Sequence, residues 1–232
     1  MLCIRSSIRS VVLCSVLYGV GLTNSLALEV NITKTLESVT VQHDGQAVKI
    51  QRNQDTDHQL SGEFTKTSRP CPPFCFQPMH AAEGVETLGE IELIQFIQTQ
   101  LADGSGLLVD SRVTEWYLKG TIPGAIHIPF TAFDPHKEPE QLKRALKLLG
   151  VEAKGSGGLF DFGKKSQWNF KKAKTIALFC NGPWCGQSPT AIHNLIALGY
   201  PPEKLKYYRG GMQLWELGGF TLITPKPNTV WK

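Results

Sequence analysis

The fold is decided by the stretch TIALFCNGPWCGQSP, residues 175–189. Its first five residues are apolar or β-branched and predict a buried strand of a parallel sheet. Ser188 as the N-cap and Pro189 at the first helical position predict the start of a helix. A strand and a helix therefore enclose a short loop that begins with Cys180.

The position of Cys180 at the start of this loop predicts an activated thiol. Backbone N–H groups converge in such a loop, and the N-terminus of the following helix adds partial positive charge. Both effects lower the pKa of a thiol and stabilise its anion. We therefore expect a sulfur nucleophile or a cradle for a transferable sulfur. The competing interpretation is a buried inert thiol, because free cysteine is among the most buried residue types.

Three further motifs accompany the Cys180 loop. One is a second strand that ends in a polar turn with Asp110 and Arg112, one is a turn rich in glycine and proline, and one is a pair of glycines followed by Trp215. In sequence letters they are LLVDSR (107–112), GTIPGA (120–125) and YYRGG (207–211). Together with the cysteine loop, and in this order, they resemble the rhodanese (sulfurtransferase) family from about Leu88 to Phe220.

The resemblance implies a fold and a reaction. The fold is α/β, a rhodanese-like parallel sheet flanked by helices, here preceded by a small β-rich N-terminal module. The implied reaction moves a sulfane sulfur through a persulfide on Cys180 to a thiol or to cyanide. Asp110 and Arg112 would support the loop by ion pairing. The expected catalytic residues are Cys180 and Cys185, and the expected substrate-binding residues are Asn181, Gly182, Trp184, Gly186, Gln187 and Ser188.

The loop departs from the family pattern in its length and in its second cysteine. It contains neither Arg nor Lys, and Gln187 stands where the family often has Arg. A rhodanese-fold phosphatase needs an Arg to clamp phosphate, so this loop disfavours that activity. We expect Cys185 to act as a resolving thiol that attacks an oxidised Cys180 and leaves a disulfide. A structural or resting disulfide of Cys185 is the alternative.

Two other cysteines lie in the proline-rich segment RPCPPFC, residues 69–75. For Cys71 and Cys75, a local disulfide, a redox partnership with the Cys180 loop and a thiolate site for zinc or copper all stay open. The spacings match no known zinc knuckle. We therefore predict no metal and no other cofactor.

The chain is expected to divide into five segments. They are a signal peptide (1–27), a small β-rich module (28–68), a Pro/Cys linker (69–86), a rhodanese-like domain (87–223) and a tail (224–232). In the module, Asp44-Gly45 between alternating runs predicts a hairpin. In the main domain we expect a capping box at 87–90, a helix at 138–149 and a glycine-rich surface insertion at 155–163. The alternation of strands and helices predicts an α/β sheet.

Charge and chemistry together indicate the partners. The net charge is +4 and falls to +2 without Arg5 and Arg9, which argues against a nucleic-acid partner. We expect a small sulfur-containing donor and a thiol acceptor, with a thiol-redox protein as a further candidate. Two other classes stay open: a non-catalytic binding module of the same fold, and a thiol redox or metal-binding protein that uses the two cysteine pairs alone.

Export is the first testable prediction. Arg5 and Arg9 precede an apolar run, and Ser25-Leu26-Ala27 fits a small-x-small cleavage site. The mature protein should therefore begin near Leu28 and be periplasmic or secreted. N-terminal sequencing of the protein from its native host should find no Met1, whereas an intact protein in the cytosol would contradict export.

Overall fold

The computed structural model describes residues 29–137, 139–154 and 167–231. The expected signal peptide, the mature start at Leu28 and the glycine-rich insertion at 155–163 lie outside these ranges. Within them, no helix combines the length and the apolar character needed to cross a membrane.

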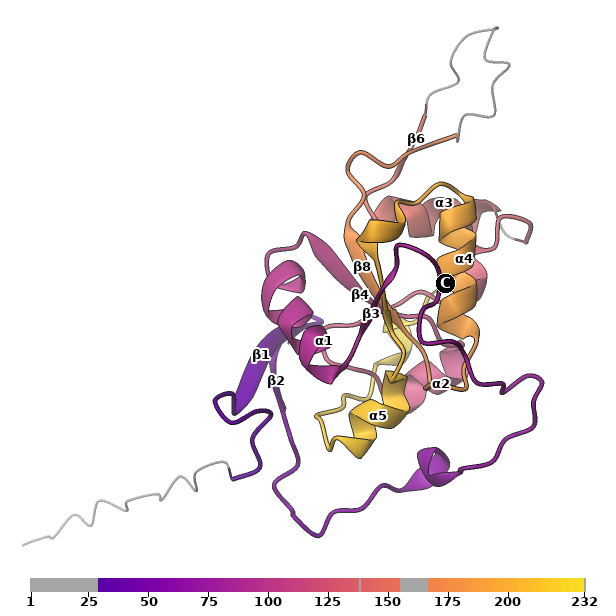
Figure 1. Cartoon of the computed structure of the whole chain (residues 1–232). Coiled ribbons are helices and arrows are strands. Elements are labelled where there is room, and N and C mark those ends of the chain that lie inside the picture. Colours follow the sequence, from indigo (N-terminus) through magenta and orange to yellow (C-terminus); the bar gives the residue numbers. More distant parts are fainter. Residues whose placement is uncertain (1–28, 138, 155–166, 232) are drawn as a thin grey trace, which may run out of the picture.

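The centre of the fold is a five-stranded parallel sheet, as expected from the sequence (Figure 1). Its strands are, in spatial order, β3 (Glu86–Leu88), β9 (Leu205–Tyr208), β8 (Thr175–Phe179), β4 (Gly106–Asp110) and β5 (Ile126–His127). Phe179 pairs with Asp110 on one side and with Tyr208 on the other. Because these strands end together, the polar turns that follow β4, β8 and β9 meet at one edge of the sheet.

Helices cover both faces of the sheet. One face packs against α1 (Glu90–Phe96), which continues as a π-helical turn (Ile97–Leu101), and against α5 (Gly211–Leu217). The other face packs against α3 (Pro139–Leu148) and α4 (Gln187–Ala197). The buried residues of β8 alternate between these two cores, as a strand with period two requires.

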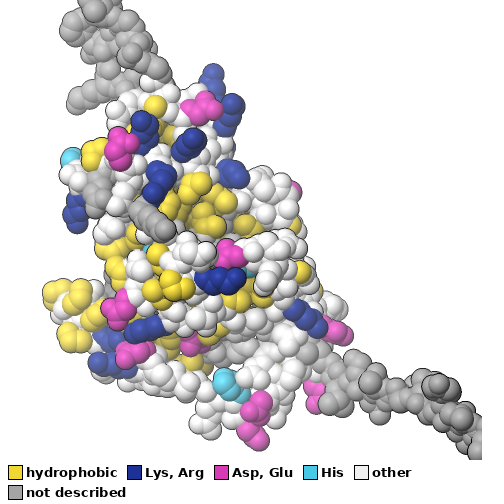
Figure 2. Space-filling model, turned by 180° about the vertical axis from the view of Figure 1, so that it is seen from behind, with side chains coloured by type: hydrophobic (Ala, Val, Ile, Leu, Met, Phe, Trp, Pro, Cys, Tyr) yellow, Lys and Arg dark blue, Asp and Glu magenta, His cyan; other side chains and the backbone are white. Residues whose placement is uncertain are grey.

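Apart from an N-terminal hairpin, the other elements in the described residues are short. They are α2 (Thr114–Lys119), the strand pair β6 (Glu152–Ala153) and β7 (Trp168–Asn169), and four 3₁₀ turns at Gly62–Thr65, Phe130–Phe133, Pro202–Lys204 and Pro227–Thr229. Seen from behind in Figure 2, basic and acidic side chains are interspersed with hydrophobic ones.

The expected N-terminal hairpin is confirmed. β1 (Ser38–His43) pairs antiparallel with β2 (Gln46–Gln51), and Asp44 and Gly45 at the turn have φ values of 50° and 76°. Ile50 is fully buried in the core on the α1 face. The hairpin therefore leans on the main domain, as a module too small for its own core must.

The starts of two helices differ from the sequence-based expectation. Thr87 is not an N-cap, because β3 pairs with β9 and draws Thr87 into the sheet; α1 begins at Glu90 after Gly89. The Glu92 carboxylate accepts the Gly89 backbone N–H at 3.1 Å. The helix after the cysteine loop also starts earlier than expected, at Gln187 with Gly186 as its N-cap, so Ser188 lies inside the first turn.

The N-terminus of α5 holds the cysteine loop by backbone contacts. The N–H groups of Met212 and Gln213 donate to the carbonyl oxygens of Cys180 and Asn181 at 3.0 and 2.9 Å. This approach requires glycine at position 211, where φ is +55° and a Cβ would lie 2.3 Å from the Cys180 carbonyl oxygen.

Gly211→Ala should therefore destabilise the protein by about 3 kcal/mol, from left-handed backbone strain plus overpacking. Gly104→Ala is the matched control, because Gly104 also has a positive φ but has open space around its Cα. It should cost only about 1 kcal/mol. Chemical denaturation of both variants measures the difference, and equal losses would contradict the close approach of α5 to the loop.

Candidate active site around Cys180

A buried ion pair joins the end of β4 to the cysteine loop. Asp110 and Arg112 are 0% and 1% exposed, and the Arg112 Nη2 lies 2.6 Å from the Asp110 Oδ2. Arg112 also donates from Nη1 to the Asn181 Oδ1 at 3.3 Å and from Nη2 to the Gly120 carbonyl. The expected ion pair is thus present, and it reaches the loop through the side chain of Asn181.

Cys180 follows directly after β8 and is 2% exposed. Burial raises the pKa of its thiol. Hydrogen bonds from the Cys185 thiol, the Ser188 hydroxyl and the backbone N–H groups of Ser188 and Gly182 outweigh burial, so that the pKa of Cys180 falls to about 7. The Ser188 hydroxyl is fully buried and makes no well-formed hydrogen bond in the described structure, so its O–H can turn toward the Cys180 sulfur. The lowered pKa favours the thiolate of Cys180 near neutral pH, compared with an ordinary thiol.

Cys185 faces the Cys180 sulfur with the opposite protonation preference. Its hydrogen bond to Cys180, its burial and the negative charge of Cys180 all raise the pKa of the Cys185 thiol. Cys185 therefore keeps its proton and donates it toward the Cys180 thiolate. Neither cysteine is in a disulfide. When Cys180 is itself protonated, its S–H donates to the Cys185 carbonyl oxygen at 3.2 Å.

A tight turn brings the two thiols together. The Cys185 backbone N–H donates to the Gly182 carbonyl at 2.9 Å, which closes the turn expected at Gly182-Pro183. At its tip, the Trp184 indole N–H donates to the Gln213 Oε1 of α5 at 2.7 Å. The loop is thus fixed from three directions: the β4 turn, α5 and its own internal turn.

The predicted binding residues have different surroundings. The backbone N–H groups of Gly182 and Ser188 stabilise the Cys180 thiolate by hydrogen bonding. Those of Asn181 and Gln187 hydrogen-bond the Cys185 sulfur instead. Gly186 caps α4, and the Gln187 Oε1 is buried without a partner among the described residues. Trp184 lies at the loop tip, only 6% exposed.

The proline-rich linker contacts the loop, and the sequence reasoning did not identify the residues involved. Arg69 stacks over the Trp184 ring at 4.1 Å, Phe74 meets the same ring edge-on at 5.6 Å, and the Gln77 N–H donates to the Pro183 carbonyl at 2.7 Å. The only signal in the sequence was the stiffness of a segment rich in proline.

Cys71 and Cys75 form a local disulfide with each other. Of the three alternatives considered for this pair, namely a local disulfide, a redox partnership with the Cys180 loop and a metal site, the structure has the first. Among the residues that the structure describes, no cluster of His, Cys, Asp and Glu could hold a metal ion. The histidine nearest the β4 turn, His127, is buried; its Nε2 contacts the Arg112 carbonyl at 2.9 Å and its ring stacks on Tyr117. Its position is that of a structural residue.

Comparison with known proteins identifies the domain. A family model described as a rhodanese-like domain matches residues 93–217, more than half of the chain. No curated protein matches.

Among solved structures, a thiosulfate sulfurtransferase from Pseudomonas aeruginosa has 17% identity and a TM-score of 0.40. The match covers 61% of this chain but only 21% of the length of that protein. A human single-domain sulfurtransferase has 22% identity and a TM-score of 0.35, covering 57% of this chain and 96% of its own. A Saccharomyces cerevisiae single-domain sulfurtransferase has 19% identity and a TM-score of 0.37, covering 58% and 91%.

The lowered pKa of Cys180 can be tested on protein reduced beforehand with dithiothreitol, by alkylation with iodoacetamide across pH, read by mass spectrometry of the Cys180 peptide. The rate should be low below neutral pH, where the thiol is protonated, and should rise through a midpoint at about 7. Ser188→Ala removes one hydrogen bond to the thiolate and should raise the midpoint by about one unit or more.

Thr190→Ala is the matched control for this titration. The Thr190 hydroxyl lies on the same helix but donates to the Gly186 carbonyl and not to the sulfur. Its loss should leave the midpoint unchanged. A wild-type midpoint near the ordinary thiol value, or an unchanged midpoint in Ser188→Ala, would contradict the described stabilisation of the thiolate.

Proposed function

Because the chain belongs to the rhodanese-like domain family, we propose that it is a sulfurtransferase that carries sulfur as a persulfide on Cys180. The observation that carries the proposal is the thiolate-stabilising environment of Cys180, with its pKa near 7 despite almost complete burial. A thiolate, not a thiol, is the nucleophile in sulfur transfer.

In the first step the Cys180 thiolate attacks the outer sulfur of the donor. With thiosulfate, the new bond joins the Cys180 sulfur to that outer sulfur, and the old S–S bond breaks to release sulfite. The negative charge then lies on the terminal sulfur of the persulfide. The N–H groups of Gly182 and Ser188 and the Ser188 hydroxyl are the donors available to stabilise it.

Two routes then remove the sulfur. An external thiolate or cyanide takes the terminal sulfur and regenerates the Cys180 thiolate. Alternatively, the Cys185 proton passes to the terminal sulfur of the persulfide, the resulting Cys185 thiolate attacks the Cys180 sulfur, and the bond to the terminal sulfur breaks to release hydrosulfide. The product of the second route is a Cys180–Cys185 disulfide, which an external dithiol must reduce.

The contact between the two thiols favours the second route. The Cys185 thiol already donates to the Cys180 sulfur and keeps its proton, because its pKa is raised. It can therefore give this proton to the terminal sulfur of the persulfide, and the Cys185 thiolate formed in that transfer is in place to attack the Cys180 sulfur. The same contact also suits a thiol oxidoreductase that cycles only between dithiol and disulfide. Detection of a persulfide distinguishes the two functions.

We also propose that the protein works outside the cytosol, on a small sulfur-containing anion and a thiol acceptor. The Arg-flanked apolar run before Leu28 supports export, and the Cys71–Cys75 disulfide is the kind of bond that persists in an oxidising compartment. A thiol-redox protein in the same compartment would serve as the reductant of the Cys180–Cys185 disulfide.

The roles of the two cysteines can be separated by substitution. Cys180→Ser is nearly isosteric, so it should keep the fold and abolish sulfur transfer from thiosulfate, polysulfide and mercaptopyruvate. Cys185→Ala should still form the persulfide but lose the dithiol-dependent release of sulfide. It should accordingly accumulate more persulfide than the wild type, measured by the mass of the intact protein.

Far-ultraviolet circular dichroism controls for folding in both variants. Full transfer activity in Cys180→Ser would refute its role as the sulfur carrier. Unchanged sulfide release by Cys185→Ala would refute the resolving role and leave transfer to an external acceptor as the remaining route.

A further inference from the structure

The sulfur of Cys180 is closed off from solvent. Cys180, Cys185 and Trp184 are 2%, 5% and 6% exposed. The cavities of about 380, 370 and 360 Å³ in the described structure are lined by other residues. A sulfur donor therefore reaches Cys180 only if the loop, or a segment packed on it, moves.

The linker between β2 and β3 packs on this loop; it runs around the outside of the domain before it enters the sheet (Figure 1). Residues 69–77 of this linker pack on the tip of the cysteine loop. The guanidinium of Arg69 lies over the Trp184 ring, the Phe74 ring meets its edge, and the Gln77 N–H holds the Pro183 carbonyl.

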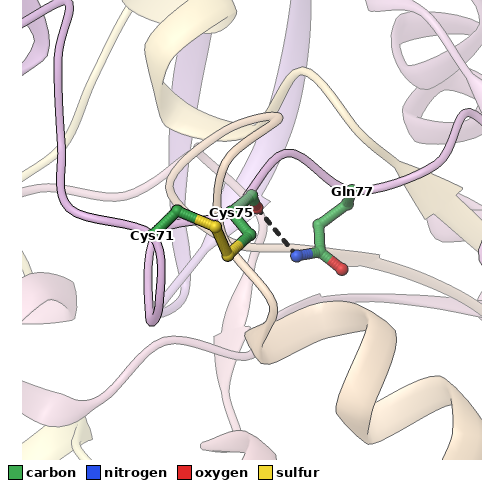
Figure 3. Close-up of a disulfide and its surroundings, with 3 residues drawn as sticks. All are labelled: Cys71, Cys75 and Gln77. Atoms are coloured by element: carbon green, nitrogen blue, oxygen red, sulfur yellow. Dashed lines mark hydrogen bonds between the residues drawn. A yellow bond between two sulfur atoms is a disulfide. The ribbon is translucent and has the colours of Figure 1, made fainter.

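The two ends of the segment are anchored, and its middle is closed by the disulfide. At one end, Arg69 donates to the Glu63 carbonyl at 2.6 Å; at the other, Arg209 donates to the Gln77 carbonyl at 2.9 Å. Between them, Cys71 and Cys75 are bonded. Figure 3 shows the side-chain amide of Gln77 turned toward the Cys75 carbonyl, to which it donates at 2.9 Å.

We infer that residues 69–77 form a redox-controlled lid, held closed over the Cys180 loop by the Cys71–Cys75 disulfide and released when a dithiol reduces that bond. In the reduction the S–S bond breaks, Cys71 and Cys75 each gain a proton and an electron, and the dithiol becomes a disulfide. The lid would make access to Cys180 depend on a supply of reductant, which the resolving step of the proposed function also needs.

The physical basis is the way in which Phe74 is held: its N–H donates to the Pro70 carbonyl at 3.0 Å, the Arg69 guanidinium lies 5.7 Å from its ring centre, and its side chain meets Trp184. Phe74 lies inside the ring closed by Cys71 and Cys75, so the disulfide restricts the backbone that aims its side chain at Trp184. Phe74 is still 37% exposed, and its contact with Trp184 is a single ring edge. Without the cross-link, the segment regains the conformational freedom that opposes such a contact.

The test is the rate at which iodoacetamide alkylates Cys180, and this readout does not depend on sulfurtransferase activity. Full-length Cys185→Ser protein is used in every arm, so that no Cys180–Cys185 disulfide forms, at a pH well above the pKa of Cys180. Peptide mass spectrometry reports the label on Cys180 alone. Reduction with dithiothreitol, or the added substitutions Cys71→Ser and Cys75→Ser, should raise the rate constant by about tenfold or more.

Two phenylalanine variants supply the matched control with the disulfide intact. Phe74→Ala removes the contact with Trp184 and should also speed alkylation, whereas Phe76→Ala alters a side chain that is 76% exposed and should not. Thermal unfolding of each variant excludes global loss of structure. Equal rate constants for the oxidised, reduced and double-serine proteins would overturn the lid, and would leave the sulfurtransferase proposal untouched.

Discussion

The structure depends on the buried ion pair of Asp110 and Arg112. Two charges removed from water are tolerated only if nearly every donor and acceptor is satisfied. Here the Asp110 carboxylate accepts hydrogen bonds from the backbone N–H, Nε and Nη2 of Arg112 and from the Thr121 hydroxyl. The Arg112 guanidinium also donates to the Gly120 carbonyl and to the Asn181 side-chain oxygen. Because Arg112 follows β4 and donates to Asn181 in the loop after β8, the pair ties the ends of these two neighbouring strands together. It thereby fixes the position at which the cysteine loop begins.

In the loop, burial and hydrogen bonding shift the pKa of Cys180 in opposite directions. A thiolate buried this deeply is disfavoured by loss of solvent, and hydrogen bonds from Gly182, Cys185 and Ser188 reverse that preference. The second thiol contributes to this balance by staying protonated. The extra cysteine is therefore part of the electrostatics of the nucleophile as well as a candidate for the resolving step. The close approach of Gly211 fixes the loop from behind and leaves it little room to adapt.

Much of this arrangement was predictable from local sequence. The apolar run into Cys180, the Asp110 turn and the glycine pair before Trp215 each carry a strong short-range signal, and the parallel sheet follows from them, whereas the ion pair was implied by the resemblance to the rhodanese family. The starts of α1 and α4 were placed wrongly because sheet pairing drew Thr87 into β3 and the loop's own turn let α4 begin at Gln187. The contacts of Arg69, Phe74 and Gln77 with the loop were not predictable, because they join segments more than 100 residues apart whose partners no local pattern specifies.

The most direct test of the account is the mass of the intact Cys185→Ala protein, in which the resolving step is absent, after exposure to a stoichiometric amount of thiosulfate or polysulfide. The lid should first be released by dithiothreitol, which is then removed. The account predicts the added mass of a single sulfur atom, located on the Cys180 peptide and lost again on treatment with cyanide. An unchanged mass with both donors, in protein whose Cys180 is shown by alkylation to be accessible and reduced, would contradict it.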